Sequence, residues 1–442
     1  MPTPSSSNRS TAGPVPLCAC APVPWQRMVF VFGSIGLLSF GGPAAQIALM
    51  HRKLVEEAGW LSERAYSNAL GFCMLLPGPE AMQLATYCGW KLRGVPGGLL
   101  AGLLFVIPGA VAIFALAGLY AAFGNVSLVS QLFLGIKAAV LIVVLEALLR
   151  LSRRALSKRR EWVIATLAFV AIFFFSLPFP LIVLAAALFG AAAGHARVCD
   201  QDAGAAGTRT SSVRTVVRVA TWLLVWLAPL AVLEWWGGAP ILSEIGWFFS
   251  KLAVVTFGGA YAVLAYMAQD VVTLHGWLSA GEMMDGLGLA ETTPGPLILV
   301  TQFVGFLAAF QSGGLWLGLA GGLVALWATF VPCFLWIFAG APFIDRISAL
   351  PRLQSALSAI IAAVVGVVLN LSVWFALHVF FTDVRVERHG WFTFWVPDLT
   401  SLDWRVLVLA VLSGLLLLRF HVSLIRTLLA AALGGVVLSH AG

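Results

Sequence analysis

Two Pro-Gly-Pro triplets interrupt apolar segments of this 442-residue chain, at Pro77-Gly78-Pro79 and at Pro294-Gly295-Pro296. Proline lacks an N–H and clashes with the preceding helical turn, so each triplet is expected to break a helix near its middle. The second proline of each triplet fits the first position of a new half-helix. The N–H groups that follow, at residues 80–82 and 297–299, together with the helix dipole, predict an anion site that needs no side-chain charge. The alternative is a kinked packing helix whose backbone is satisfied by its neighbours.

Phe40-Gly41-Gly42 and Phe257-Gly258-Gly259 form a second matched pair of motifs inside apolar segments. Two glycines cost helix stability but let another backbone approach closely. Direct contact with a ligand and tight packing against the broken helices are both open interpretations.

Few ionisable residues lie in the apolar segments. Glu80 follows the first triplet and Glu291 precedes the second. A carboxyl group within a membrane is costly to ionise, which suits a proton carrier, so both residues are candidates for proton coupling. For Glu80 the alternative is simple capping of the helix by its carboxylate. Lys137 either attracts an oxyanion or pairs with an acidic side chain to hold two spans together.

The composition predicts a membrane protein. Hydrophobic residues make up 60% of the chain and charged residues only 10%, against roughly 25% charged in soluble domains. The basic residues behind the net charge of +7 lie in short loops, where they set orientation and do not indicate nucleic-acid binding. The sequence contains no phosphate-binding loop for ATP, no metal-site spacing and no nucleophile elbow, so neither a cofactor nor an enzymatic activity is expected.

A membrane span needs about 20 mostly apolar residues, and such runs predict an all-α polytopic membrane protein with about 13 transmembrane helices. We expect a disordered cytoplasmic N-terminal extension without a signal peptide at 1–27. We further expect an N-terminal membrane repeat at 28–195, a linker plus an extra transmembrane helix at 196–246, and a C-terminal membrane repeat at 247–442. The candidate spans are 28–50, 65–90, 98–123, 131–151, 161–176, 179–194, 219–236, 247–270, 281–307, 316–340, 357–380, 404–418 and 421–438.

The chain repeats itself with an offset of 217 residues. This offset places the first Pro-Gly-Pro triplet on the second, Phe40-Gly41-Gly42 on Phe257-Gly258-Gly259, and Gly59-Trp60-Leu61-Ser62 on Gly276-Trp277-Leu278-Ser279. Shared apolar composition would not align three such motifs in one register, so the sequence predicts a duplication.

Lys and Arg near the span ends place 150–160 and 341–356 in the cytoplasm, and 124–130 and 381–403 outside. Because 124–130 corresponds to 341–356 in the repeat, the two halves are expected to have inverted topology, and the extra span 219–236 supplies the odd crossing. The N-terminus is then cytoplasmic, in a bacterial inner membrane. Inverted repeats with paired broken helices are a common plan of secondary transporters, whose substrate sites lie at the breaks.

With these motifs the chain resembles the chromate ion transporter (CHR) family in its long two-domain form. The resemblance runs from about residue 28 to residue 438. It is carried by Ser39-Phe40-Gly41-Gly42-Pro43, Trp60-Leu61, Leu76-Pro77-Gly78-Pro79-Glu80 with Gln83-Leu84-Ala85, Phe105-Val106-Ile107-Pro108-Gly109, Thr256-Phe257-Gly258-Gly259, and Thr293-Pro294-Gly295-Pro296 with Gln302-Phe303-Val304-Gly305.

The resemblance implies export of chromate, a tetrahedral dianion similar to sulfate, at the expense of the proton motive force. The expected partners are this oxyanion, protons and the lipid bilayer, and a homodimer is left open. A carrier for sulfate or another oxyanion, an intramembrane enzyme acting on phosphorylated lipids, and an anion channel are the alternatives. The candidate substrate-binding residues are Phe40, Gly41, Gly42, Pro77, Gly78, Pro79, Glu80, Gln83, Lys137, Phe257, Gly258, Gly259, Thr293, Pro294, Gly295, Pro296 and Gln302.

Overall fold

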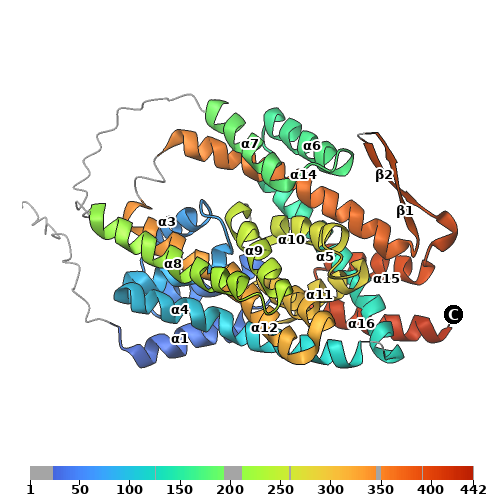
Figure 1. Ribbon diagram of the computed structural model, residues 1–442, viewed down its shortest axis with the longest axis horizontal. Coiled ribbons are helices and arrows are strands. Elements are labelled where there is room, and N and C mark those ends of the chain that lie inside the picture. The colour runs from blue at the N-terminus through green and yellow to red at the C-terminus, as the bar shows by residue number, and fades with distance from the viewer. Residues whose placement is uncertain are drawn as a thin grey trace, which may run out of the picture.

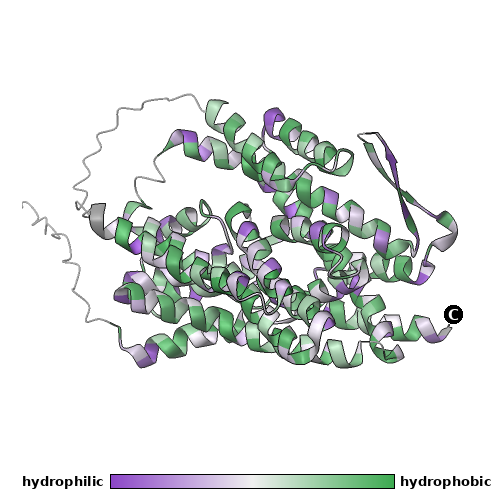
Figure 2. Cartoon of the chain, in the orientation of Figure 1, coloured by the Kyte–Doolittle hydropathy of each residue, from purple (hydrophilic) through white to green (hydrophobic). Residues whose placement is uncertain are grey.

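The described part of the chain is a bundle of helices (Figure 1) that are apolar along most of their length (Figure 2). Five helices are long and apolar enough to cross a membrane, and several shorter apolar helices accompany them. The predicted helical membrane protein is therefore confirmed. The predicted N-terminal extension up to residue 22, the linker at 196–211 and Gly258-Gly259 lie outside the described residues. The computed structural model describes residues 23–124, 126–193, 212–257, 260–344, 350–390 and 392–441.

The first half begins with short helices separated by breaks and continues with long ones. Its longest helix, α4, leaves helical geometry at Arg93 and Gly94, and the chain turns back there. A Cβ atom on Gly97 would lie 2.4 Å from the carbonyl oxygen of Gly89, so the two arms of α4 touch through glycine. The elements are α1 (Trp25–Leu38), α2 (Gly42–His51), the π-helix η1 (Arg52–Glu57), α3 (Glu63–Cys73), α4 (Glu80–Phe123), α5 (Ser127–Ala155), α6 (Arg159–Phe173) and α7 (Phe179–Ala193).

The second half uses the same construction. Its longest helix, α12, turns back at Gly313 and Gly314, and a Cβ atom on Gly321 would lie 2.3 Å from the carbonyl oxygen of Gly305. The elements, with η marking 3-10 and π segments, are α8 (Ser212–Trp236), α9 (Pro240–Val255), α10 (Ala260–Gln269), η2 (Asp270–Leu274), α11 (Ala280–Thr292), η3 (Leu297–Leu299), α12 (Val300–Gly340), η4 (Ala341–Phe343), α14 (Pro351–Phe380), η5 (Leu399–Ser401), α15 (Trp404–Gly414), η6 (Leu415–Arg419) and α16 (Leu424–Ala441).

Four of the predicted spans, 28–50, 65–90, 247–270 and 281–307, are not single helices, because a break divides each of them into two. The 14 residues of α1 extend about 21 Å at 1.5 Å per residue, whereas the hydrocarbon core of a bilayer is about 30 Å thick. Each apolar run is predicted as one candidate crossing, because run length alone does not show whether a broken segment crosses fully or is re-entrant.

The outer ends of the broken helices lie close together. Arg27 at the start of α1 contacts the ring of Trp60, between η1 and α3, at 5.9 Å. At the kink of α4, Arg93 Nε donates to the carbonyl oxygen of Val23 at 2.6 Å. The start of α1, the η1–α3 loop and the kink of α4 therefore share one end of the molecule.

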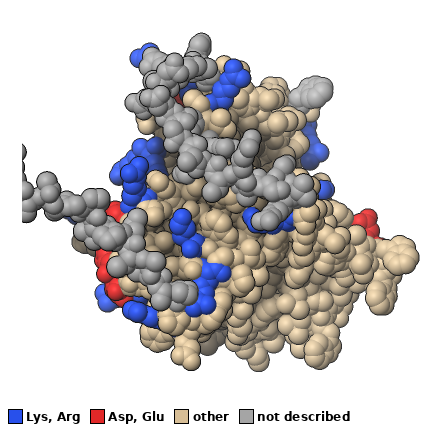
Figure 3. All heavy atoms as spheres, turned by 90° about the vertical axis from the view of Figure 1, so that its left-hand side faces the viewer, with Lys and Arg blue, Asp and Glu red and all other residues tan. Residues whose placement is uncertain are grey.

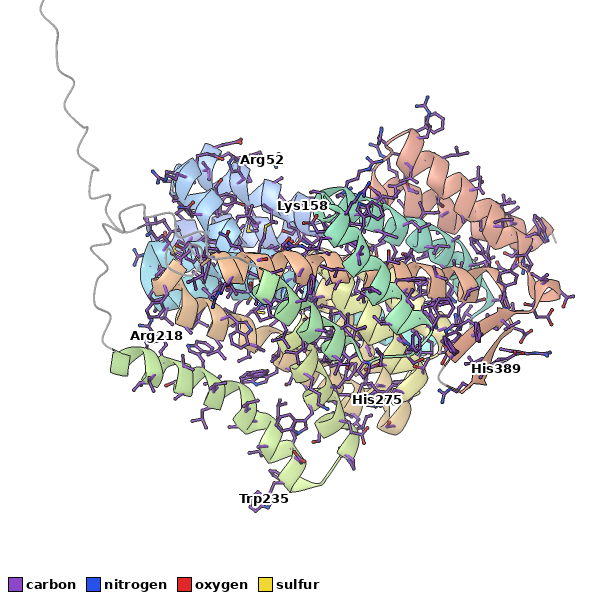
Figure 4. All side chains as sticks on the ribbon, turned by 90° about the horizontal axis from the view of Figure 1, so that it is seen from above. Arg52, Lys158, Arg218, Trp235, His275 and His389 are labelled. Carbon is purple, nitrogen blue, oxygen red and sulfur yellow. The ribbon has the colours of Figure 1, made fainter. Side chains whose placement is uncertain are left out.

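The molecule has two sides of different character. In Figure 4, Arg52 and Lys158 lie toward the top and Arg218 lies at the left, whereas Trp235 lies at the bottom and His389 lies toward the lower right. We call these the basic side and the hairpin side. Figure 3, which shows the left-hand end of Figure 1, displays many Lys and Arg side chains and few acidic ones.

A two-stranded antiparallel hairpin occupies the predicted outside loop, so the chain is not purely α-helical. β1 (Val384–His389) pairs with β2 (Phe392–Pro397), and the first residue of β1 lies opposite the last residue of β2. Valine, threonine and aromatic residues alternate with polar ones here, a pattern that favours strands. Thr393 N donates to the carbonyl oxygen of Phe174 at 2.8 Å, which attaches the hairpin to the end of α6.

The core lies where the two halves meet. α14 packs against α5, α6 and α7 of the first half, and α12 packs against α4. The predicted extra span, α8, packs on the outside of α12 and α9 and leaves Trp235 and Trp236 exposed. The packing of second-half helices on first-half helices brings the breaks of both halves together.

Candidate functional site

Each Pro-Gly-Pro triplet separates two helices, as the sequence predicts. Pro79 is the N-cap residue of α4, and Pro296 is the N-cap residue of η3, which leads into α12. Gly78 and Gly295 have φ angles of +112° and +95°, a region that side chains other than glycine rarely adopt. A Cβ atom on Gly78 would also lie 3.1 Å from Cys333 Sγ. A Cβ atom on Gly295 would likewise lie 3.1 Å from Leu299 Cδ1, so both breaks need glycine for their backbone conformation and for space.

Two backbone hydrogen bonds connect the halves through these breaks. Gly78 N donates to the carbonyl oxygen of Thr256 at 2.9 Å, and Gly295 N donates to the carbonyl oxygen of Ser39 at 2.8 Å. The two donors are 217 residues apart, and so are the two acceptors. Ser39 and Thr256 are the C-cap residues of α1 and α9. Each Pro-Gly-Pro break is thus held by the Phe-Gly-Gly break of the other half.

Glutamine side chains bond to the backbone around the breaks. Gln83 Nε2 donates to the carbonyl oxygen of Pro77 at 2.6 Å, and Gln46 Nε2 donates to that of Gly295 at 2.6 Å. Gln302 Nε2 donates to a backbone carbonyl oxygen of α4 at 2.9 Å. Gln83 and Gln302 therefore support the backbone in this structure. The predicted site residues that lie within the breaks are Phe40, Gly41, Pro77, Gly78, Pro79, Phe257, Thr293, Pro294, Gly295 and Pro296.

A cavity of 420 Å³, which we call the inner cavity, lies beside the first Phe-Gly-Gly break and is lined by Gly41 and Gly42. It brings together the two proton-coupling candidates, Glu80 from the start of α4 and Glu291 from the end of α11. Its ionisable lining residues are Glu80, Glu146, Arg150, Arg154, Tyr261, Glu291 and His421.

The charges of the inner cavity are unevenly paired. Arg150 forms a salt bridge with Glu146 one turn earlier on α5, at 2.5 Å. Arg154 contacts Met74 Sδ at 3.5 Å and forms no salt bridge with any side chain that the structure describes. Arg154 and Glu80 also line a neighbouring cavity of 370 Å³ together. An anion entering this region meets an arginine that forms no salt bridge within the described residues, although it interacts electrostatically with Glu80.

The two starting points of the half-helices are placed differently. The first backbone N–H to bond within α4 is that of Gln83, which donates to Pro79 O at 3.1 Å. The N–H groups of residues 80–82 therefore come before the first intrahelical backbone hydrogen bond of α4. Glu80, in this segment, lines the inner cavity. In the second half, 297–299 form a buried 3-10 turn and are not among the described residues that line this cavity. The structure brings the first predicted helix start to the cavity and keeps the second within the protein.

Lys137 lies away from the inner cavity and forms an ion pair, which is one of the alternatives that the sequence leaves open. Its Nζ atom is 3.4 Å from Asp285 Oδ1, and the pair joins α5 to α11. Both residues line a second cavity of 590 Å³, which we call the outer cavity. Along α5, Lys137 precedes Arg150 by 13 residues, or about 20 Å of helix.

A family profile described as "Chromate transporter" matches residues 26–191 and 243–436. The chain belongs to the chromate transporter family. The two matched segments each contain one Phe-Gly-Gly motif and one Pro-Gly-Pro triplet, so the family covers all four breaks.

Members of the chromate transporter family in several bacteria are similar over most of this chain. The chromate transport protein of Cupriavidus metallidurans is 30% identical over 343 residues, covering 78% of this chain and 80% of the relative. That of Pseudomonas aeruginosa is 31% identical over 379 residues, covering 83% of each. The probable chromate transport protein of Synechococcus elongatus is 28% identical over 354 residues, covering 78% of this chain and 82% of the relative. No solved structure matches the chain.

Several residues of the inner cavity were not predicted for this chromate transporter homologue. In the sequence, Arg150 and Arg154 belong to the basic segment 150–160, which predicts only the orientation of the chain in the membrane. Glu146, Arg150 and Arg154 follow one another at intervals of four residues, which places all three on one face of a helix and was an available signal. Tyr261 donates to Glu291 Oε1 at 3.0 Å, a contact across a break that local spacing does not reveal.

Proposed function

We propose that the chain is a secondary active carrier that exports chromate from the cytoplasm, driven by the proton motive force, and that the inner cavity receives the substrate. The observation that carries this proposal is that Arg150 and Arg154 meet the start of α4 at a cavity beside the crossed breaks. Arginine stays charged, and its planar guanidinium suits an oxyanion. A helix N-terminus adds about half a positive charge.

The protonation state of the carboxyl groups decides how well the charge of the inner cavity matches that of a dianion. Arg150 is already paired with Glu146, so Arg154 and the helix start supply about one and a half positive charges toward a dianion. Glu80 and Glu291 repel the dianion when ionised and can donate a hydrogen bond when protonated. The charge of Glu80 and Glu291 is therefore expected to affect how tightly chromate binds from the cytoplasm.

The membrane potential favours this direction of transport. Moving one charge through an inside-negative potential changes the free energy by about 2.3 kcal/mol per 100 mV. The free energy of a dianion therefore falls by about twice this amount per 100 mV when the dianion leaves the cell. Export thus needs no nucleotide, in keeping with the lack of an ATP-binding motif.

We further propose that 28–195 and 247–442 are inverted repeats joined by the linker and extra helix at 196–246. The exchanged hydrogen bonds of Gly78 and Gly295 support this, because donors and acceptors share one offset. The matching returns of α4 and α12 through glycine contacts also support it. Inverted repeats place their broken helices around a shared axis near the bilayer midplane.

In this arrangement the basic side faces the cytoplasm of a bacterial inner membrane, and the four divided segments are re-entrant: each enters and leaves on one side. Between α2 and α3, η1 contains Arg52 and Lys53, and the first turn of α3 contains Arg64, whereas residues 271–280 contain neither Lys nor Arg. The positive-inside rule then places the first loop inside and the second outside. This reading keeps the N-terminus cytoplasmic and removes four of the predicted crossings.

Uptake of chromate into everted membrane vesicles tests the proposed function, since uptake there corresponds to export. We expect saturable uptake that continues without ATP while the proton motive force is maintained, and that stops with a protonophore. Uptake that follows ATP instead would contradict a secondary carrier. Sulfate, which has the same charge and shape, is added as a competitor, and stronger uptake of sulfate than of chromate would assign the chain to sulfate transport.

A further inference from the structure

The outer cavity contains a buried carboxyl group that the proposed substrate site does not use. Asp285 on α11 is only 5% exposed, yet it lines this 590 Å³ cavity. Its Oδ2 atom accepts a hydrogen bond from Tyr120 at 2.8 Å. Its Oδ1 atom accepts no hydrogen bond from the described residues. The Lys137 Nζ atom is 3.4 Å from Oδ1, beyond the usual 2.7–2.9 Å or so of a charge-assisted hydrogen bond.

The charged groups around Asp285 make the outer cavity unsuitable for an anion. Lys137 faces Asp285 from α5, Tyr120 from α4 and Glu282 from α11 itself, so two carboxyl groups share one ammonium group. The α12 residues that line the cavity are not ionisable; they are Leu307, Phe310 and Gln311.

Glu282 is already engaged by its neighbours. Its Oε2 atom accepts the N–H of Ser279 at 2.7 Å, and its Oε1 atom accepts from Gln311 at 3.1 Å. Of the two carboxyl groups, Asp285 is the one with an oxygen that accepts no hydrogen bond from the described residues.

We infer that Asp285 is the outer proton-binding site of the carrier and that Lys137 is the group released when a proton binds. The inference rests on the proposed proton-driven export. A hydronium ion on the hairpin side transfers its proton to Oδ1: one O–H bond of the hydronium ion breaks, an O–H bond forms on Asp285, and a water molecule is left. Neutral Asp285 no longer attracts the Lys137 ammonium group, so the electrostatic link between α5 and α11 is lost.

The position of the pair connects proton binding to the substrate site. Between the two cavities, Gly288 of α11 lies against α5, where a Cβ atom would be 2.3 Å from Ile136 Cγ2. Gly288 and Ile136 line neither of the two cavities. Glu291 lies six residues after Asp285 on α11, or about 9 Å along the helix. Release of Lys137 therefore loosens the two helices that carry Glu291 and Arg154.

Proton and chromate fluxes measured together in proteoliposomes test this inference. The full chain is reconstituted, and chromate exchange and the accompanying change of lumenal pH are recorded with a pH-sensitive dye. In Asp285→Asn combined with Lys137→Gln, which avoids an unpaired charge, we expect the ratio of protons to chromate to fall at least tenfold. Asp285→Glu keeps a carboxyl group and should retain coupling. Glu282→Gln, in the same cavity, is the matched control and should keep the wild-type ratio.

The possible outcomes separate the inference from the proposed function. If wild-type protein does not exchange chromate, the proposed function fails. If it does, and the double variant keeps the wild-type proton ratio, Asp285 is not the proton site. Equal loss of both fluxes in a double variant that unfolds at the wild-type temperature would also overturn the inference, because the pair would then belong to the anion path. If the double variant does not fold, the single variants test the inference. Loss of proton coupling in Asp285→Glu would contradict it, and so would loss of proton coupling in Glu282→Gln.

Discussion

At the scale of single residues, the two arginines that line the inner cavity differ in whether they form a salt bridge. Arg150 is held by Glu146, whereas Arg154 forms no salt bridge within the described residues. Arg153 is also exposed on α5 but does not line the inner cavity. These two neighbouring arginines carry the same charge and differ in access to the proposed substrate.

Replacement of Arg154 by Gln is expected to weaken chromate binding, because a hydrogen bond to a charged group contributes about 1.5–3 kcal/mol. The KM for chromate uptake into everted vesicles should rise about 10- to 150-fold. Arg153→Gln removes the same charge from the basic loop and should change KM less than about twofold, as expected for a surface residue. Equal effects of both substitutions would assign Arg154 to orientation or surface attraction alone.

The glycines of the two triplets allow a second prediction. Gly78→Val and Gly295→Val place a β-branched side chain at positive φ, which costs roughly 1–2 kcal/mol before any clash. Because each glycine N–H bonds to the other half, transport should fall at least tenfold while the protein still reaches the membrane. Gly71→Val, in α3 with no atom within 4 Å of its Cβ position, is the control. Normal chromate uptake by both triplet variants would show that the breaks are not needed.

At the scale of elements, the breaks were predictable because proline and glycine act on their own backbone. The backbone hydrogen bonds between the halves were not predictable, because Ser39 lies 256 residues from Gly295 in the sequence and no local pattern connects the two residues. The inner cavity was predicted in part: Glu80 and Glu291 were expected to act in proton coupling, but Arg154 and Tyr261 reach the cavity through helix packing. The hairpin was missed because its alternating pattern lies between long apolar runs and was taken as a loop.

The contact between α5 and α11 gives an element-scale prediction. Gly288→Ala forces the helices apart at Ile136, and overpacking of this kind typically costs about 1–3 kcal/mol. We expect lower thermal stability and a loss of coupling between proton and chromate fluxes in proteoliposomes. Addition of Ile136→Ala makes room for the new methyl group and should restore both properties. A Gly288→Ala protein that is as stable and as tightly coupled as wild type would show that this contact is not needed for coupling.

At the scale of the whole molecule, the division of four predicted spans changes which loops face which side. If 28–50 crosses the membrane, the loop after α2 is periplasmic; if α1 and α2 form a re-entrant pair, that loop is cytoplasmic. The second half gives the opposite pair of alternatives for the loop after α10. The positions of 124–130 and 341–356 are the same in both cases, so only the loops beside the breaks distinguish the two topologies.

Cysteine labelling in a variant without native cysteines resolves this question. We expect Ala58→Cys to react with a membrane-impermeant maleimide only in everted vesicles, as Ser157→Cys on the basic side does. Leu274→Cys, at a residue that is 72% exposed, should react only in right-side-out vesicles, as Glu387→Cys in the hairpin does. The physical reason is that α1 is too short to cross the roughly 30 Å hydrocarbon core and its start lies beside Trp60. Labelling of Ala58→Cys from outside and of Leu274→Cys from inside would restore full crossings for 28–50 and 247–270.

Equal labelling of residues 124–130 and 341–356 from one side would instead end the inverted-repeat proposal.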